Sequence, residues 1–193
     1  MNELSLHVMD IIQNSIDADS TIIQTKIQVD EAGKKIIMVI KDNGYGMDKD
    51  TLRKVVDPFY TSRTTREIGL GISMFKGAAE LSGGDFDIAS QKGLGTQVTA
   101  TFNNHSIDRQ PMGNIGNVFF LLLLSHSKID MKLELASTTG SFIFCSKPFI
   151  KAVVASGESN MEAAFKSETL INNQLQVIFQ GILPELEAEN ETK

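Results

Sequence analysis

The chain has 193 residues, of which 41% are hydrophobic and 22% are charged, and its formal net charge is −6. This length suits one large domain or two small ones, and the acidic balance without a Lys/Arg run argues against a general nucleic-acid binder. Cys145 is the only cysteine, which excludes an internal disulfide and favours a reducing cytoplasm. The start lacks a signal-peptide pattern, and the apolar run 118–124 is far below the roughly 18–20 residues of a membrane span. We therefore expect a cytoplasmic protein without a membrane segment.

The first half of the chain shows helical and strand periodicities in turn. The expected elements are a helix over 3–18, strands over 21–29 and 35–41, a short helix over 48–56, a helix over 70–81, and a hairpin of strands over 85–90 and 96–102. The stretch 58–69 is polar and rich in Thr and Arg, which suits a mobile loop. Together these elements predict a first domain over 1–103.

The second half follows a polar stretch over 103–111 that is typical of a boundary. Its expected elements are a buried helix over 115–124, a hairpin of strands over 130–136 and 141–145, and helices over 148–155 and 160–179. These patterns predict a small α/β accessory or docking region over 104–193, ending in a frayed acidic tail. No catalytic constellation is visible in this half.

Polar side chains interrupt the apolar pattern of the first helix. Asp10, Asn14 and Asp17 lie at positions i, i+4 and i+7 and share one face, together with His7. Such a face is favourable where it lines a polar cavity: Asn14 can supply a hard oxygen to Mg²⁺, and Asp10 can orient or deprotonate a water molecule. The alternative is a solvated helix face, with His7 as a structural histidine.

The segment Asp42-Asn-Gly44-Tyr-Gly46 follows an apolar strand and is itself followed by Met47. The Asp42 carboxylate can accept a hydrogen bond from an exocyclic amine, and the glycines allow the backbone to approach a flat ring. The alternative is an ordinary turn of Asp, Asn and Gly.

Two further glycine segments complete the pattern. Gly69-Leu70-Gly71 opens a helix, whose first N–H groups and positive dipole end suit a polyphosphate. Arg63 and Arg66, just upstream, can add charged hydrogen bonds, although a helix start with two solvated arginines is the alternative. The tight turn before Thr96 can bring its hydroxyl to a purine, or it can be a plain hairpin turn.

The order and spacing of these segments resemble the Bergerat-fold ATPases, a family that includes DNA gyrase B, MutL, the large ATP-driven heat-shock chaperones and the catalytic domains of histidine kinases. The segments that carry the resemblance are Asp10–Ala18 for the first box, Asp42–Gly46 for the adenine-binding box, Asp57–Arg63 for the kinase lid, Ile68–Ile72 for the second glycine box and Gly93–Thr96 for the third. The resemblance covers about the first half of the chain. It implies an α/β, two-layer sandwich in which a mixed, mostly antiparallel sheet packs on helices.

The resemblance also implies the ligands, ATP and Mg²⁺, and a role for each motif residue. Asn14 would ligate Mg²⁺, Asp42 would recognise the adenine amine, and Gly46 and Thr96 would help to seat the base. The phosphates would be held by the second glycine box with one of the upstream arginines. The remaining residues expected to bind the nucleotide are Asp17, Gly44, Met47, Phe59, Arg63, Arg66, Gly69, Leu70 and Gly71.

One catalytic position departs from the family pattern. Asp10 stands where hydrolysing members usually have Glu and many kinases have Asn. Because Asp is one methylene shorter than Glu, and misplacement on this scale can reduce a rate by about 10²-fold, we expect slow hydrolysis or a kinase-like polarisation of an acceptor hydroxyl.

Sensor histidine kinases place a phospho-accepting His ahead of the ATPase domain, whereas here the first box begins near Met1 and neither His105 nor His126 has a phospho-acceptor context. We therefore expect a stand-alone regulatory ATPase or Ser/Thr-type protein kinase, possible as a homodimer, with a regulatory protein partner rather than nucleic acid or a membrane. The alternative is a nucleotide-gated protein-binding module with little or no turnover.

Overall fold

The computed structural model of the chain describes residues 3–30, 32–55 and 70–186. Within them, the elements are α1 (Leu4–Asp17), β1 (Ile22–Val29), β2 (Lys35–Asp42), α2 (Lys49–Val55), α3 (Leu70–Leu81), β3 (Phe86–Gln91), β4 (Gly95–Asn103), α4 (Ile115–Ser125), β5 (Asp130–Ser137), β6 (Gly140–Cys145), α5 (Ser146–Ala155), α6 (Asn160–Phe179) and the 3₁₀ turn η1 (Pro184–Leu186). The expected helices and strands are therefore present, whereas the predicted mobile loop over 58–69 lies outside the described residues. None of the described helices is long and apolar enough to cross a membrane.

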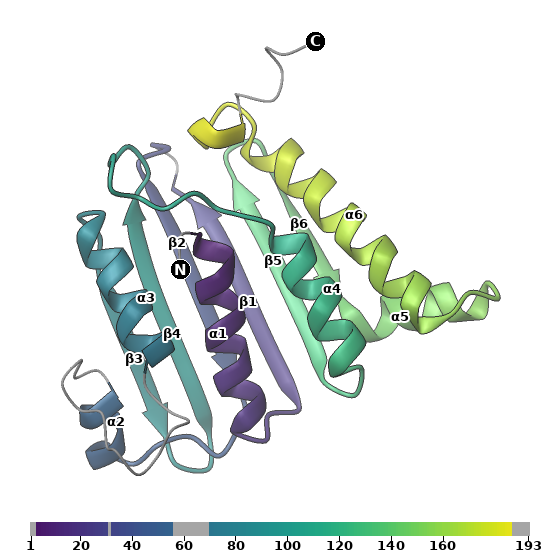
Figure 1. Cartoon of the computed structure of the whole chain (residues 1–193), viewed down its shortest axis with the longest axis horizontal. Coiled ribbons are helices and arrows are strands. Elements are labelled where there is room, and N and C mark those ends of the chain that lie inside the picture. The colour runs from purple at the N-terminus through teal and green to yellow at the C-terminus, as the bar shows by residue number, and fades with distance from the viewer. Residues whose placement is uncertain (1–2, 31, 56–69, 187–193) are drawn as a thin grey trace.

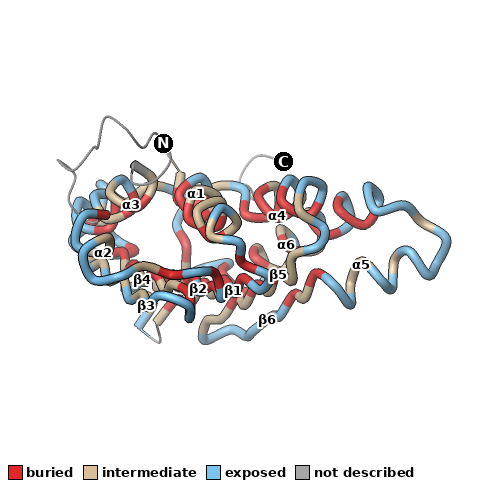
Figure 2. Tube along the Cα trace, turned by 90° about the horizontal axis from the view of Figure 1, so that it is seen from below, coloured by how far each residue is buried: buried red, intermediate tan, exposed pale blue. Residues whose placement is uncertain are grey.

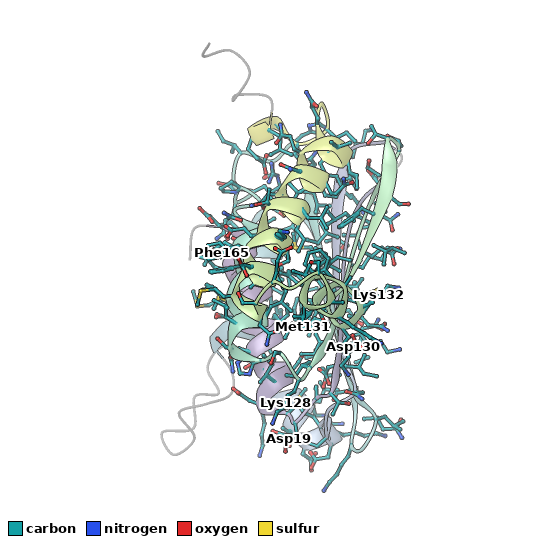
Figure 3. The ribbon with its side chains drawn as sticks, turned by 90° about the vertical axis from the view of Figure 1, so that its right-hand side faces the viewer. Asp19, Lys128, Asp130, Met131, Lys132 and Phe165 are labelled. Atoms are coloured by element: carbon teal, nitrogen blue, oxygen red, sulfur yellow. The ribbon has the colours of Figure 1, made fainter. Side chains whose placement is uncertain are left out.

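The strands form one sheet in the order β3-β4-β2-β1-β5-β6. All neighbouring pairs are antiparallel except β1 and β5, which run parallel with Ile22 beside Asp130. Helices α1, α3, α4 and α6 cover one face of this sheet (Figures 1 and 2). An edge-on view shows Phe165 of α6 on the helix side and Lys132 of β5 on the sheet side (Figure 3). The prediction of a two-layer sandwich with a mixed, mostly antiparallel sheet is confirmed.

The core lies between the helices and the sheet, where the two sequence periodicities meet. On β1, Ile23, Thr25 and Ile27 are buried while Gln24 and Lys26 between them are more exposed, as alternation in a half-buried strand requires. On α1, Leu4 and Val8 are fully buried and lie on the face toward the sheet. Burying these two faces together fixes the position of α1, which carries Asp10, Asn14 and Asp17 of the predicted site.

The second half of the chain continues the sheet of the first half. The β5–β6 hairpin joins through the parallel β1–β5 pairing, α6 packs against it, and α4 packs on α6 and contacts β6 through Phe119 and Phe144. The buried core also runs through residues of both halves. The division into a domain over 1–103 and an accessory or docking region over 104–193 stays a prediction. A sheet that continues through both halves is compatible with a docking function for its outer strands.

The segment that connects the two halves also caps α1. The first backbone N–H groups of a helix have no partner inside the helix. Here Leu4 N donates to Pro111 O over 2.9 Å, and Ser5 N donates to Met112 O over 2.8 Å. The connecting segment therefore holds the beginning of α1 by hydrogen bonds in place of a side-chain cap.

A largely buried ion pair between Arg109 and Glu185 fastens the same segment to η1. Both guanidinium nitrogens Nη1 and Nη2 of Arg109 donate to the Glu185 carboxylate, over 2.9 and 2.6 Å, and the side chains are only 5% and 22% exposed. Met112 N donates to the same carboxylate over 2.9 Å. Burial alone would raise the pKa of Glu185, but the hydrogen bonds from Arg109 and the backbone N–H groups lower it overall.

One predicted helix start differs from the structure. The sequence predicts a helix from Pro148, whereas α5 begins at Ser146, directly after β6. Pro148 therefore occupies the first turn of α5, where its missing N–H has no intrahelical acceptor to lose and its fixed φ suits the helix. A proline in the sequence thus indicates that a helix begins nearby, but it does not show which residue is the first.

Candidate nucleotide-binding site

A cavity of about 330 Å³ opens between α1, β2, the start of α3 and the β3–β4 hairpin. Its lining residues are Ile11, Asn14, Ser15, Asp17, Ala18, Ile40, Asp42, Tyr45, Gly46, Met47, Asp48, Thr51, Ile72, Lys92, Thr96 and Val98. The fold thus brings together six of the predicted site residues from distant segments: Asn14, Asp17, Asp42, Gly46, Met47 and Thr96.

The Asp42 carboxylate is the most tightly held group of the cavity. It ends β2, is 8% exposed, and accepts three hydrogen bonds from the protein. Ser15 Oγ donates to Oδ2 over 2.8 Å, while the backbone N–H groups of Gly44 and Thr96 donate to Oδ1 over 2.9 and 3.2 Å. These hydrogen bonds hold the carboxylate in a fixed orientation.

The glycines of this region make room for the protein's own backbone. A Cβ at Gly44 would lie 2.5 Å from the Ala18 carbonyl oxygen, and one at Gly46 would lie 2.1 Å from the Gln91 carbonyl oxygen, where φ is also +60°. The sequence interpretation assigned these glycines to the approach of a flat ring. The structure gives them a further reason, which is close packing of the turn against α1 and β3.

Two serines that the sequence analysis did not single out complete the hydrogen-bond network. Ser15 orients Asp42, and Ser90 Oγ lies 2.9 Å from the Thr96 hydroxyl while accepting from Met47 N over 2.8 Å. Ser15 directly follows the motif residue Asn14, which was the available signal. Ser90 lies in an unremarkable strand pattern and offered none.

Asp10 lies outside the cavity lining, next to the first turn of α3. A Cβ placed on Gly71 would be 3.1 Å from Asp10 Cβ and 3.3 Å from its Oδ2 atom. Burial raises the pKa of Asp10, an effect that the nearby His7 partly opposes. Asp10 therefore faces the end of α3 at which the glycine segment was predicted to hold phosphates.

His7 is a buried side chain of α1 with defined neighbours. Its Nε2 lies 2.9 Å from Gln110 Oε1, and its ring stacks on Phe75 of α3 with the centroids 5.5 Å apart. Burial lowers the pKa of His7, whereas the Gln110 hydrogen bond and the charge of Asp10 raise it in part. The ring therefore favours its neutral form at neutral pH and links α1 to α3 and to the connecting segment.

Five predicted site residues are not fully described by the structure. Phe59, Arg63, Arg66 and Gly69 lie outside the described residues, and for Leu70, at the start of α3, only the backbone is described. In the part of the chain that the structure describes, no group of at least three His, Cys, Asp or Glu side chains can hold a metal ion. Asn14 as a Mg²⁺ ligand stays a prediction.

Fold and cavity together define a two-layer α/β domain in which a buried carboxylate, that of Asp42, ends a central strand and lines the cavity. The model of the family described as histidine kinase-, DNA gyrase B-, and HSP90-like ATPase matches residues 2–106, which is just over half of the chain. The chain belongs to this family, and its first half is an ATP-binding domain of this type.

Individual proteins with sequences or structures similar to this chain include sensor proteins and DNA repair proteins. A protein of Shewanella frigidimarina named as a sensor protein is 36% identical over 101 residues, covering 49% of this chain and 15% of that protein. The DNA mismatch repair protein MutL of Clostridium acetobutylicum is 37% identical over 59 residues, covering 31% of this chain and 9% of that protein. The crystal structure of the N-terminal domain of a DNA repair protein superposes with a TM-score of 0.53 at 14% identity, over 75% of this chain and 52% of that one. The chain thus spans less than a quarter of these two sequence relatives.

Proposed function

We propose that the cavity binds the adenine of Mg-ATP, and that the chain then acts as a regulatory ATPase or Ser/Thr-type protein kinase. The observation that carries this proposal is the hydrogen-bonding state of Asp42. A carboxylate offers about four acceptor positions, and three of them are filled by protein donors. One position remains for a ligand donor such as the adenine amine, and the apolar side chains of Ile40, Met47 and Val98 in the same cavity suit a flat ring.

The phosphate end of the proposed site lies where α1 meets α3. Asn14 lines the cavity and would offer its amide oxygen to Mg²⁺, which would neutralise charge on the polyphosphate. The first N–H groups of α3 would bind phosphate oxygens. Asp10, one turn before Asn14 and beside Gly71, would accept the proton of an attacking water or of an acceptor hydroxyl. Its raised pKa means that it holds a proton more readily than an ordinary Asp side chain.

The binding proposal is tested with Asp42→Asn, a nearly isosteric change that removes the charge. Calorimetric titration with Mg-ATP is expected to show about 100-fold weaker binding, because the carboxylate is the acceptor for the base. Asp87→Asn, an exposed carboxylate on β3, serves as the control and should bind as the unaltered chain does. Equal affinities for the unaltered chain and Asp42→Asn would remove this assignment of the cavity.

The chemistry is tested separately with Asp10→Asn. Phosphate release, or labelling of a partner protein from γ-labelled ATP, is expected to fall by about 10²-fold while ATP affinity is kept. Label on a partner Ser or Thr would identify a kinase, and phosphate release alone an ATPase. Undiminished turnover in Asp10→Asn would show that another group accepts the proton.

A second candidate function is nucleotide-gated binding of a cytoplasmic protein, and the hydrogen bonds at the start of α1 favour it. Leu4 and Ser5 of α1 are bonded to the connecting segment, which Arg109 fastens to Glu185. A shift of α1 on ATP binding would therefore reach the C-terminal half. A ligand shifts such an equilibrium only if it binds the two states differently, so partner capture from lysate should depend on ATP. Equal capture with and without ATP would eliminate this candidate.

A further inference from the structure

We propose that Tyr45 stacks its ring on the base bound at Asp42 and thereby sets the affinity of the cavity for purine nucleotides. This inference rests on the proposed binding of ATP and adds a binding residue to that site. Tyr45 belongs to the segment Asp42–Gly46, which is proposed to bind adenine. The motif itself does not determine whether the Tyr45 side chain faces solvent or the ligand.

The backbone of Tyr45 is fixed on both sides. Its N–H donates to the Ala18 carbonyl at the end of α1 over 3.0 Å, and its carbonyl accepts from Gly93 N in the β3–β4 turn over 2.7 Å. The flanking Gly44 and Gly46 pack so closely against neighbouring carbonyl groups that neither has space for a Cβ. The residue therefore bridges the end of α1 and the hairpin, and its position does not depend on its own side chain.

The side chain, in contrast, is left open to the cavity and to solvent. Tyr45 lines the cavity and is 50% exposed. Among the described residues that line the cavity, it alone is aromatic. A rigid aromatic ring on a fixed backbone loses little conformational freedom when a ligand covers it, and a base stacked on such a ring gains both apolar contact and π interaction.

Asp42 and Tyr45 would then read different parts of the base. The carboxylate accepts from an exocyclic amine and so distinguishes one purine from another, whereas a stacked ring contacts a face that all purines share. Loss of the Tyr45 ring should weaken the binding of ATP and of GTP by the same factor. Loss of the Asp42 charge should change the ratio of the two binding affinities. Neither side chain is required to hold the phosphates.

The chain offers a direct optical test, because it has no Trp and only two Tyr residues, Tyr45 and Tyr60. In a Tyr60→Phe background, whose ATP affinity is first measured by calorimetry, Tyr45 is the sole tyrosine emitter. Added ATP is expected to quench its fluorescence with a midpoint equal to the calorimetric Kd. Free tyrosine amide with the same ATP concentrations corrects for absorption by the nucleotide. Absence of saturable quenching while calorimetry detects binding would overturn the proposal.

Affinity measurements on variants give the second arm of the test. Tyr45→Ala should bind ATP and GTP about tenfold more weakly, and Tyr45→Phe should bind within about twofold of the original. Leu81→Ala, which removes an apolar side chain that is 64% exposed at the last residue of α3, is the matched control and should change nothing. Melting temperatures establish that each variant is folded.

The outcomes separate this inference from the proposed function. Inorganic triphosphate should bind Tyr45→Ala and the original chain equally, so an equal loss for triphosphate and ATP would contradict stacking. If ATP binding depends on Asp42 but not on Tyr45, the stacking inference fails and the binding proposal stands. If the original chain does not bind ATP at all, both fail. A loss in Tyr45→Phe as large as in Tyr45→Ala would also overturn stacking, because the ring is still present.

Discussion

The cavity half of the chain, residues 3–103, and the C-terminal half, residues 104–186, share one sheet but differ in what they bury. The cavity half buries polar side chains among its core residues: Ser5, His7, Ser15, Ser20, Thr25, Asp42 and Ser82. The C-terminal half buries few: Asn104, Ser146 and Ser167. Two of the buried polar side chains of the cavity half, Ser15 and Asp42, line the cavity and are joined by a hydrogen bond. We therefore expect the first half to bind the nucleotide and the second half to contribute mainly to the stability of the fold.

The largest expected effect tests whether the C-terminal half acts through stability alone. Phe119 of α4 is buried and packs edge-on against Phe144 of β6. Phe119→Ala should lower the free energy of unfolding by about 3–5 kcal/mol, because it leaves a cavity in the core. Chemical denaturation measures this loss, and Phe165→Ala, at a ring that is 54% exposed, is the control with an expected loss below about 1 kcal/mol.

The same Phe119→Ala variant sharpens the comparison when its ATP affinity is measured. Under conditions where the variant is folded, the Kd should stay within about twofold of the original, because Phe119 lies in the half without the cavity. A large change in Kd would show instead that the packing of α4 is transmitted to α1, and the division between binding and supporting halves would be wrong.

A smaller effect is expected where the two halves are fastened together by Arg109 and Glu185. Glu185→Gln leaves the 5% exposed guanidinium without its carboxylate and should lower stability by about 3 kcal/mol at neutral pH. Because the folded-state pKa of Glu185 lies below its ordinary value of 4.5, its contribution is complete above that pH and is lost as pH falls through the folded-state value. The difference between the original chain and Glu185→Gln should therefore shrink in acid.

Denaturation at several pH values checks both the size and the sign of this effect. Glu158→Gln removes the partner of Lys166 at a site where the lysine is 55% exposed, and it should change stability by at most about 1 kcal/mol. A Glu185→Gln deficit that is constant from neutral to acidic pH would contradict the role of the ionised carboxylate in fastening the connecting segment.

The sequence predicted local structure well because helical and strand periodicities are strong in elements such as α1 and β1. It could not predict that β5 would pair in parallel with β1, since that register depends on contacts between residues more than one hundred positions apart. In the site, charged and glycine motifs indicated Asp42 and Gly46. Ser15 could have been inferred from its place directly after Asn14, whereas the Ser90 hydroxyl carries no signal in its strand pattern, so its place in the network emerges only in three dimensions.

The smallest effect is expected on the open face of the sheet, where Lys26 of β1 meets Glu134 of β5 over 3.0 Å across the parallel junction of the two halves. The side chains are 41% and 30% exposed, so water and salt screen the pair. A double-mutant cycle with Lys26→Ala and Glu134→Ala should give a coupling below about 0.5 kcal/mol, which added salt reduces further. A coupling of several kcal/mol would mean that this ion pair holds the cavity half and the C-terminal half together more strongly than the β1–β5 backbone hydrogen bonds and the shared core do.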